Sequence, residues 1–129
     1  MDANGDIASV FDKALSRELL QAPARLAFTH DNPGYWPAWN IDWEDQQQPP
    51  YAYVKGPAKV TIVERGPVRV ALRVERAAEG STIVQTIRLT AGGAGNHLQV
   101  DCDINWRSKD CNFKAVFPLN AANPQATYN

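Results

Sequence analysis

Residues 68–75 read VRVALRVE and residues 82–89 read TIVQTIRL, and these two stretches decide the fold. In both, apolar and mostly polar side chains alternate at every second position, which is the period of a β-strand with one buried face. Residues 78–81, AEGS, lie between them and are typical of a tight turn. The pattern therefore predicts two adjacent antiparallel strands.

Three further stretches show the same alternation, namely residues 58–63, 98–106 and 113–119. The last two can be placed in register around a turn at residues 107–110, with Trp106 opposite Cys111 and every inward residue facing another. The sequence therefore predicts that they form a hairpin. Because this register keeps Cys102 and Cys111 out of direct opposition, we expect two free thiols and no disulfide.

The N-terminal third is less regular. Residues 7–12 are typical of a strand, and residues 26–29 of a short one. Residues 12–20 have the propensities of a helix, or they form a hairpin that turns near residues 13–17. We favour the hairpin because its surroundings are all strand. Many short strands and no convincing long helix predict an all-β fold, a single antiparallel β-sandwich over residues 1–129.

The composition is that of an ordinary globular protein. The chain has 129 residues, 44% of them hydrophobic and 21% charged, and its formal net charge is −1. Without a field of either sign, nucleic acids and membranes are not expected partners. No apolar run reaches the length of a membrane span, and the N-terminus lacks the pattern of a signal peptide. Together with free thiols, this favours a cytoplasmic location.

Residues 30–53 break the strand pattern. This segment contains four prolines, three of the four tryptophans and three of the four tyrosines. Long loops of this kind are usually functional or disordered, and the aromatic content argues against disorder. In one interpretation the rings pin the loop over the end of the sandwich or against a neighbouring domain. In the other they border a carbohydrate site. The candidate residues for that site are Asp31, Tyr35, Trp36, Trp39, Asp42 and Trp43.

The chain offers no recognisable catalytic group. A glycosidase needs two carboxyls on opposite sides of the scissile bond, but Asp42, Glu44 and Asp45 are too close in sequence to supply them. The dipeptide His30-Asp31 is too weak a signal for a metal site. We therefore predict no catalytic residue, no metal ligand and no cofactor within this chain.

Several polar residues have plain structural explanations. Gln85 stands in an inward row, which predicts either a buried amide with a hydrogen-bond partner or an edge position. Arg69, Arg73 and Arg88 lie on the opposite faces of their strands, where they form a solvated face, an ion-pair ladder with Glu75, or a docking surface.

An ordered set of short motifs resembles the C-terminal β-region of glycoside hydrolase family 38 α-mannosidases. They are residues 4–13 (NGDIASVFDK), 17–20 (RELL), 31–33 (DNP), 36–42 (WPAWNID), 66–70 (GPVRV), 85–89 (QTIRL), 103–106 (DINW), Leu119 and 126–128 (ATY). Pro37 and Asn40 stand where many members carry acidic residues, which puts any substrate contact through those carboxylates in doubt.

The resemblance implies a parent enzyme that is a retaining exo-α-mannosidase. Its nucleophile and its divalent metal, usually zinc, would belong to an N-terminal α/β barrel that is not part of this chain. The chain itself would be a fragment of a galactose-mutarotase-like supersandwich that packs on the barrel. The expected partners are then the parent catalytic domain and a mannose-containing oligosaccharide.

Three hypotheses for function follow. The first is a non-catalytic β-domain of an α-mannosidase that hydrolyses terminal α-mannosides, with the aromatic loop near the sugar site. The second is an autonomous carbohydrate-binding module that uses Trp36, Trp39 and Trp43. The third is a pure interdomain scaffold whose aromatic loop is buried against the barrel.

Overall fold

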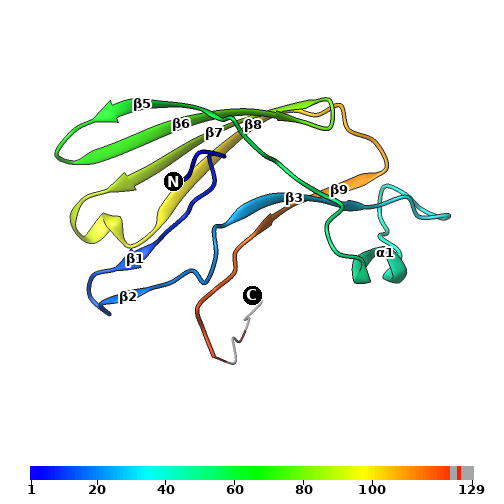
Figure 1. Ribbon diagram of the computed structural model, residues 1–129, viewed down its shortest axis with the longest axis horizontal. Coiled ribbons are helices and arrows are strands. Elements are labelled where there is room, and N and C mark those ends of the chain that lie inside the picture. The colour runs from blue at the N-terminus through cyan, green and yellow to red at the C-terminus, as the bar shows by residue number, and fades with distance from the viewer. Residues whose placement is uncertain (123–124, 126–129) are drawn as a thin grey trace.

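The computed structural model describes residues 1–122 and residue 125, and it is almost entirely β-structure (Figure 1). Its largest sheet has the order β5-β6-β7-β8 and a second sheet has the order β4-β3-β9, while β1 and β2 pair alone. All the strand pairs are antiparallel, and the two larger sheets lie over each other as two layers. The predicted antiparallel sandwich is confirmed. The strands are β1 (Phe11–Asp12), β2 (Arg17–Glu18), β3 (Arg25–His30), β4 (Ala52–Tyr53), β5 (Lys59–Arg65), β6 (Arg69–Ala78), β7 (Ser81–Thr90), β8 (Leu98–Asn105) and β9 (Cys111–Val116).

The strands β6 and β7 form the hairpin that the sequence predicts. Glu79 and Gly80 connect them with φ values of 50° and 77°, the backbone of a two-residue hairpin turn. The register places Val74 opposite Gln85 and continues without interruption along both strands. Strand β8 continues the sheet on the far side of β7, after a short 3-10 helix over Gly92–Gly95.

The predicted hairpin between residues 98–106 and 113–119 is wrong. Strand β8 pairs with β7, whereas β9 pairs with β3 in the other sheet. The connection after β8 crosses between the layers and is held there by Ser81, whose hydroxyl accepts hydrogen bonds from the backbone N–H groups of Arg107 (2.8 Å) and Ser108 (3.0 Å). Cys102 and Cys111 consequently lie on different sheets, and both are free thiols.

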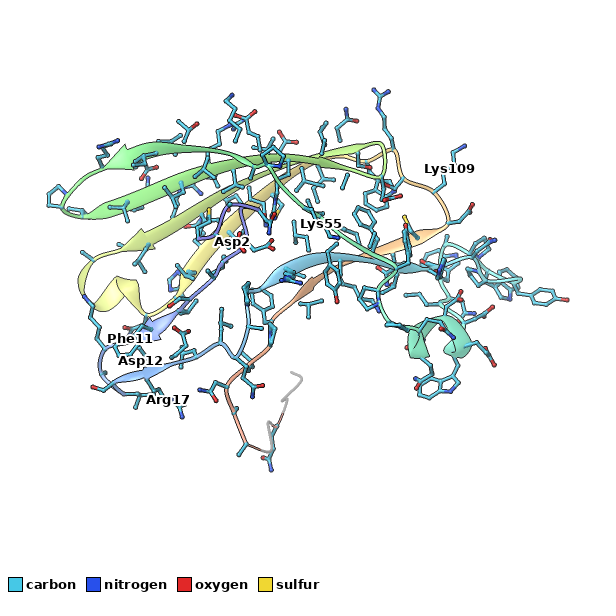
Figure 2. All side chains as sticks on the ribbon, in the orientation of Figure 1. Asp2, Phe11, Asp12, Arg17, Lys55 and Lys109 are labelled. Carbon is cyan, nitrogen blue, oxygen red and sulfur yellow. The ribbon has the colours of Figure 1, made fainter. Side chains whose placement is uncertain are left out.

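Residues 12–20 form a hairpin and no helix, as the surrounding strands indicated. Asp12 stabilises the turn because its Oδ1 atom accepts hydrogen bonds from the backbone N–H groups of Ala14 (2.8 Å) and Leu15 (3.0 Å). The paired strands β1 and β2 are only two residues each, so the predicted strand over residues 7–12 is shorter than expected. Figure 2 shows Phe11, Asp12 and Arg17 together at this end of the molecule.

The core lies between the two larger sheets. Leu26, Phe28, Val54 and Ile83 form its buried centre. The ring of Phe28 is fully buried and stacks against Trp106 at 6.0 Å between ring centroids. Aromatic pairs in such geometry add to the stability that burial alone gives.

A charged pair is buried beside this core. Arg76 continues the inward row of β6 and donates a 2.8 Å hydrogen bond to Asp6, with 2% and 3% of the two side chains exposed. Arg76 also donates to the Gln85 side-chain oxygen, so the prediction that Gln85 is a satisfied buried amide is confirmed. Burial raises the pKa of Asp6, although the Arg76 guanidinium acts in the opposite direction.

The outer face of the large sheet carries linked ion pairs. Glu75 pairs with Lys59 at 3.0 Å and with Arg73 at 3.4 Å. A second group joins Arg69 and Arg88 to Glu64, and Arg88 also pairs with Asp101. The ladder anticipated at Glu75 is therefore present for Arg73, while the other two arginines use different carboxylates.

Two further findings depend on which residues the structure describes. The motif at residues 126–128 lies outside the described residues. Among the residues that the structure describes, no helix has the length and apolar character needed to cross a membrane.

Candidate functional site

The aromatic segment, residues 30–53, connects the end of β3 to β4, and most of it is irregular. It contains one short helix, α1 (Trp43–Gln47), which the sequence did not predict. Asp42 precedes this helix, and its carbonyl accepts a 3.1 Å hydrogen bond from the backbone N–H of Gln46. The segment lies at the end of the molecule opposite the β1–β2 hairpin (Figure 1), on the side where Figure 2 labels Lys109.

Trp36 sets the path of the loop before α1. Its φ angle of 57° lies in the left-handed region, which a bulky side chain seldom adopts. The Trp36 carbonyl accepts hydrogen bonds from the backbone N–H groups of Trp39 (2.8 Å) and Asn40 (3.0 Å). The tight turn therefore brings Trp36 and Trp39 to its two ends, with Pro37 inside it.

Four large rings of the aromatic segment are largely exposed. The exposed fractions are 81% for Tyr35, 75% for Trp36, 89% for Trp39 and 67% for Trp43. Within residues 1–122 none of these four rings contacts another ring, unlike Phe28 in the core, which stacks against Trp106. The rings therefore do not pin the loop to the sandwich, and their apolar faces are available to another molecule or domain.

The carboxylates of the segment are partly committed to the loop itself. Asp42 accepts a 2.8 Å hydrogen bond from the side-chain nitrogen of Asn40, and Asp45 accepts a 3.4 Å bond from the backbone N–H of Asn32. Asp31 follows β3 and is half-buried, and its Oδ1 atom has no hydrogen-bond partner. The Asp31 Oδ1 atom is buried, so an outside hydroxyl group does not reach it. Asp42 can accept a further hydrogen bond from a hydroxyl group, while Asn40 acts as an internal brace.

The base of the loop holds a ring contact, between His30 and Tyr51, that the sequence analysis did not predict. The rings of His30 and Tyr51 are in tilted contact with centroids 4.7 Å apart, and the Tyr51 ring also lies 6.3 Å from the Phe28 ring between centroids. Burial and the neighbouring Cys111 thiol raise the pKa of Tyr51 to about 12. This ring contact joins the exposed loop to the core. The sequence feature that could have predicted it is the presence of an aromatic residue near each end of the segment.

The described residues do not bring together the ligands of a metal centre. Over residues 1–122 and residue 125, no three His, Cys, Asp or Glu side chains come together in an arrangement that could hold a metal ion. A divalent metal needs several such ligands, so the described residues do not fit one. What the arrangement can offer is an exposed aromatic surface bordered by hydroxyl-accepting carboxylates.

Comparison with known proteins identifies the family. No protein of known function matches the chain in a search of curated sequences. The family model for the glycosyl hydrolases family 38 C-terminal domain matches residues 1–129. The expected resemblance is thus confirmed over the whole sequence, and this chain belongs to the C-terminal domain family of the family 38 glycosyl hydrolases.

Proposed function

We propose that this chain is the non-catalytic β-domain of an α-mannosidase that hydrolyses terminal α-mannosides. In this proposal the aromatic segment packs on the catalytic domain and borders its sugar site. Because the chain belongs to this family, its parent enzyme is a glycosyl hydrolase. The nucleophile and the zinc or other divalent metal then belong to the catalytic domain.

The observation that carries the proposal is the exposure of Tyr35, Trp36, Trp39 and Trp43 at one end of the sandwich. Apolar groups that gather on a protein surface usually mark a site of interaction. Aromatic side chains bury about 150–250 Å² each when they are covered, so a neighbour that covers four of them gains a substantial contact. A domain of the same enzyme is the neighbour that family membership suggests.

The same rings suit the edge of a sugar site. Their flat faces can stack on the apolar C–H faces of a pyranose, while Asp42 accepts hydrogen bonds from hydroxyls. In α-mannosides these contacts would orient the sugar without taking part in bond cleavage.

A binding experiment tests the packing on the catalytic domain. The chain should bind the separately produced catalytic domain of its enzyme, and Trp39→Ala should weaken that binding at least tenfold. Val68→Ala is the matched control, because Val68 is also apolar and exposed but lies in the β5–β6 turn, outside the aromatic segment. Equal binding by both variants and the unchanged chain would contradict the proposal.

The sugar contact has its own measurement. In the full enzyme, Trp39→Ala should raise the KM for an aryl α-mannoside more than it lowers kcat, because the ring binds substrate without entering the chemistry. The isolated chain, supplied with zinc, should not hydrolyse the same substrate. Clear turnover by the isolated chain would overturn the assignment as non-catalytic.

The exposed rings also favour a second candidate, an autonomous carbohydrate-binding module that uses Trp36, Trp39 and Trp43. It requires the isolated chain to bind sugar. Titration with mannose or mannobiose to millimolar concentrations should then quench the tryptophan fluorescence, whereas a flat titration would exclude this candidate in favour of packing on the catalytic domain.

A further inference from the structure

The aromatic segment carries an excess of negative charge. It contains Asp31, Asp42, Glu44 and Asp45 but no Lys or Arg, in a chain whose formal net charge is −1. Three of these residues, Asp42, Glu44 and Asp45, stand at the start of α1, and we call them the α1 carboxylates. The negative charge of the chain is therefore concentrated in the same segment as the exposed rings.

This chain does not neutralise the α1 carboxylates. The ion pairs of the described residues all lie elsewhere, at Asp6 and on the outer face of the large sheet. The residues outside the description, 123–124 and 126–129, contain no Lys or Arg. Asp42 and Asp45 accept hydrogen bonds only from a side-chain amide and a backbone N–H, which are neutral donors. Any counter-charge must therefore come from a partner.

The α1 carboxylates are interleaved with aromatic rings. Asp42 and Glu44 flank Trp43, and Trp43 begins α1, a helix without a buried residue. Trp39, the most exposed of the four rings, lies three positions before Asp42. The side chain of Asn40, the residue that follows Trp39, donates the hydrogen bond that Asp42 accepts. A partner that covers these rings therefore also approaches the carboxylates.

The arginine guanidinium group suits both features of this surface. It stacks on aromatic faces through cation–π contacts, and it binds carboxylates with two parallel N–H donors. The lysine ammonium group is a more strongly hydrated point charge, so covering it with aromatic rings costs more hydration. The aromatic segment already holds one guanidinium in this way, because the Arg25 guanidinium carbon lies 5.5 Å from the centroid of the Tyr53 ring.

We propose that the α1 carboxylates and the exposed rings dock on an arginine-bearing face of the parent enzyme's catalytic domain. This inference rests on the proposed function, and it names the chemistry of the surface on which the aromatic segment packs. Guanidinium groups of that surface pair with Glu44 and Asp45 and stack on Trp43. The ion pairs speed association and fix the orientation of the two domains, while the rings supply buried apolar area.

A second copy of this chain is a poor occupant of the same surface. A symmetric contact through the aromatic segment would bring two sets of α1 carboxylates together, and like charges facing each other across an interface are unfavourable. The segment itself has no Lys or Arg with which to compensate them. The charge pattern thus selects a partner that differs from this chain.

The salt dependence of binding tests the inference. The chain should bind the separately produced catalytic domain about tenfold more weakly at about 500 mM than at about 50 mM sodium chloride, because salt screens ion pairs. At low salt, Glu44→Gln should weaken binding about threefold to fivefold and reduce the salt dependence. Asp103→Asn is the matched control, because Asp103 is exposed and lies on β8, outside the aromatic segment, and should bind like the unchanged chain.

A competition experiment tests the choice of arginine. Arginine hydrochloride at about 100 mM should weaken the binding more than lysine hydrochloride at the same concentration, because the guanidinium competes for the rings as well as for the carboxylates. Equal inhibition by the two salts would refute an arginine-bearing partner surface.

The outcomes separate this inference from the proposed function. Binding that is lost in Trp39→Ala but unaffected by salt and by Glu44→Gln would leave the packing on the catalytic domain intact and overturn this inference alone. Absence of binding at both salt concentrations would refute the packing itself, and this inference with it. Self-association of the chain at low salt that is lost in Trp39→Ala would assign the surface to a second copy and overturn the arginine-bearing partner.

Discussion

Arg76 donates a 2.8 Å hydrogen bond to Asp6, a residue 70 positions earlier in the sequence, and the two side chains are 2% and 3% exposed. This contact fastens the N-terminal segment to the inner face of β6. It is also the place where a charged pair has been taken out of water, which makes it sensitive to the loss of either partner.

Removing the Arg76 charge should therefore destabilise the fold strongly. We expect Arg76→Met to lower the free energy of unfolding by about 3–5 kcal/mol, because it leaves the buried Asp6 carboxylate with Arg25, which is 45% exposed and lies at 3.7 Å, as its ion-pair partner. The measurement is urea unfolding followed by circular dichroism. Arg73→Met is the control, since Arg73 is 44% exposed and its loss should cost less than about 1 kcal/mol. Equal effects of the two variants would show that the buried pair is not critical.

Gly5 should not tolerate a side chain. Its φ of 78° disfavours any L-residue, and a Cβ atom there would lie 2.6 Å from the Val74 side chain and 2.8 Å from that of Ala58. Gly5→Ala should lower the free energy of unfolding by more than about 1 kcal/mol. Gly80→Ala provides the comparison, because Gly80 has a φ of 77° but no atom within 4 Å of the added Cβ. The difference between the two variants measures the steric contribution, and a larger loss for Gly80→Ala would contradict it.

The β1–β2 hairpin should loosen in acid. Hydrogen bonds from the Ser9 hydroxyl and from the backbone N–H groups of Leu20 and Val10 lower the pKa of Glu18. A carboxylate with a lowered pKa in the folded state stabilises it above the unfolded pKa, and this contribution is lost as the pH falls through the folded pKa. Amide exchange at Val10 and Leu20, corrected for intrinsic rates, should therefore accelerate in acid. Glu18→Gln should remove this pH dependence, and an unchanged acid response in that variant would refute the role of Glu18.

The exposed rings should contribute little to the stability of the isolated chain. Trp39→Ala should change the free energy of unfolding by less than about 0.5 kcal/mol, since 89% of Trp39 is exposed. Phe28→Ala, by contrast, should cost about 3–5 kcal/mol because the ring is fully buried. A large loss of stability in Trp39→Ala would mean that the ring packs against the sandwich after all.

The alternation of apolar and polar residues predicted well which side chains of a strand point inward. It did not predict which strand lies next to which in the sheets. The inward rows of β6 and β7 meet as expected because a tight turn at Glu79 and Gly80 leaves no other choice. Between β8 and β9 the same pattern fits a hairpin or two separate sheets. In the structure β9 pairs with β3, and the Ser81 hydroxyl holds the connection between β8 and β9. Both contacts join residues that lie far apart in the sequence, so the alternation of side chains does not reveal them.

Sequence-based prediction has a similar limit for the buried Arg76–Asp6 pair and for the aromatic segment. Arg76 continues the row of Leu72 and Val74, so its inward position could be counted from the strand period, but its partner Asp6 comes from a different segment. In the aromatic segment the sequence predicted candidate residues for a sugar site, and the structure shows that their four large rings are exposed. Their exposure could not be predicted, because it depends on what the rest of the chain leaves uncovered.

The distribution of the tryptophans makes the chain a built-in optical probe. Trp36, Trp39 and Trp43 already lie in water in the folded state, and Trp106 alone stacks on the core. Most of the intrinsic emission should therefore remain nearly constant when the sandwich unfolds, and fluorescence would underestimate denaturation. The same emission should shift to shorter wavelength whenever a partner covers the loop, so it reports occupancy of that surface and not the integrity of the fold.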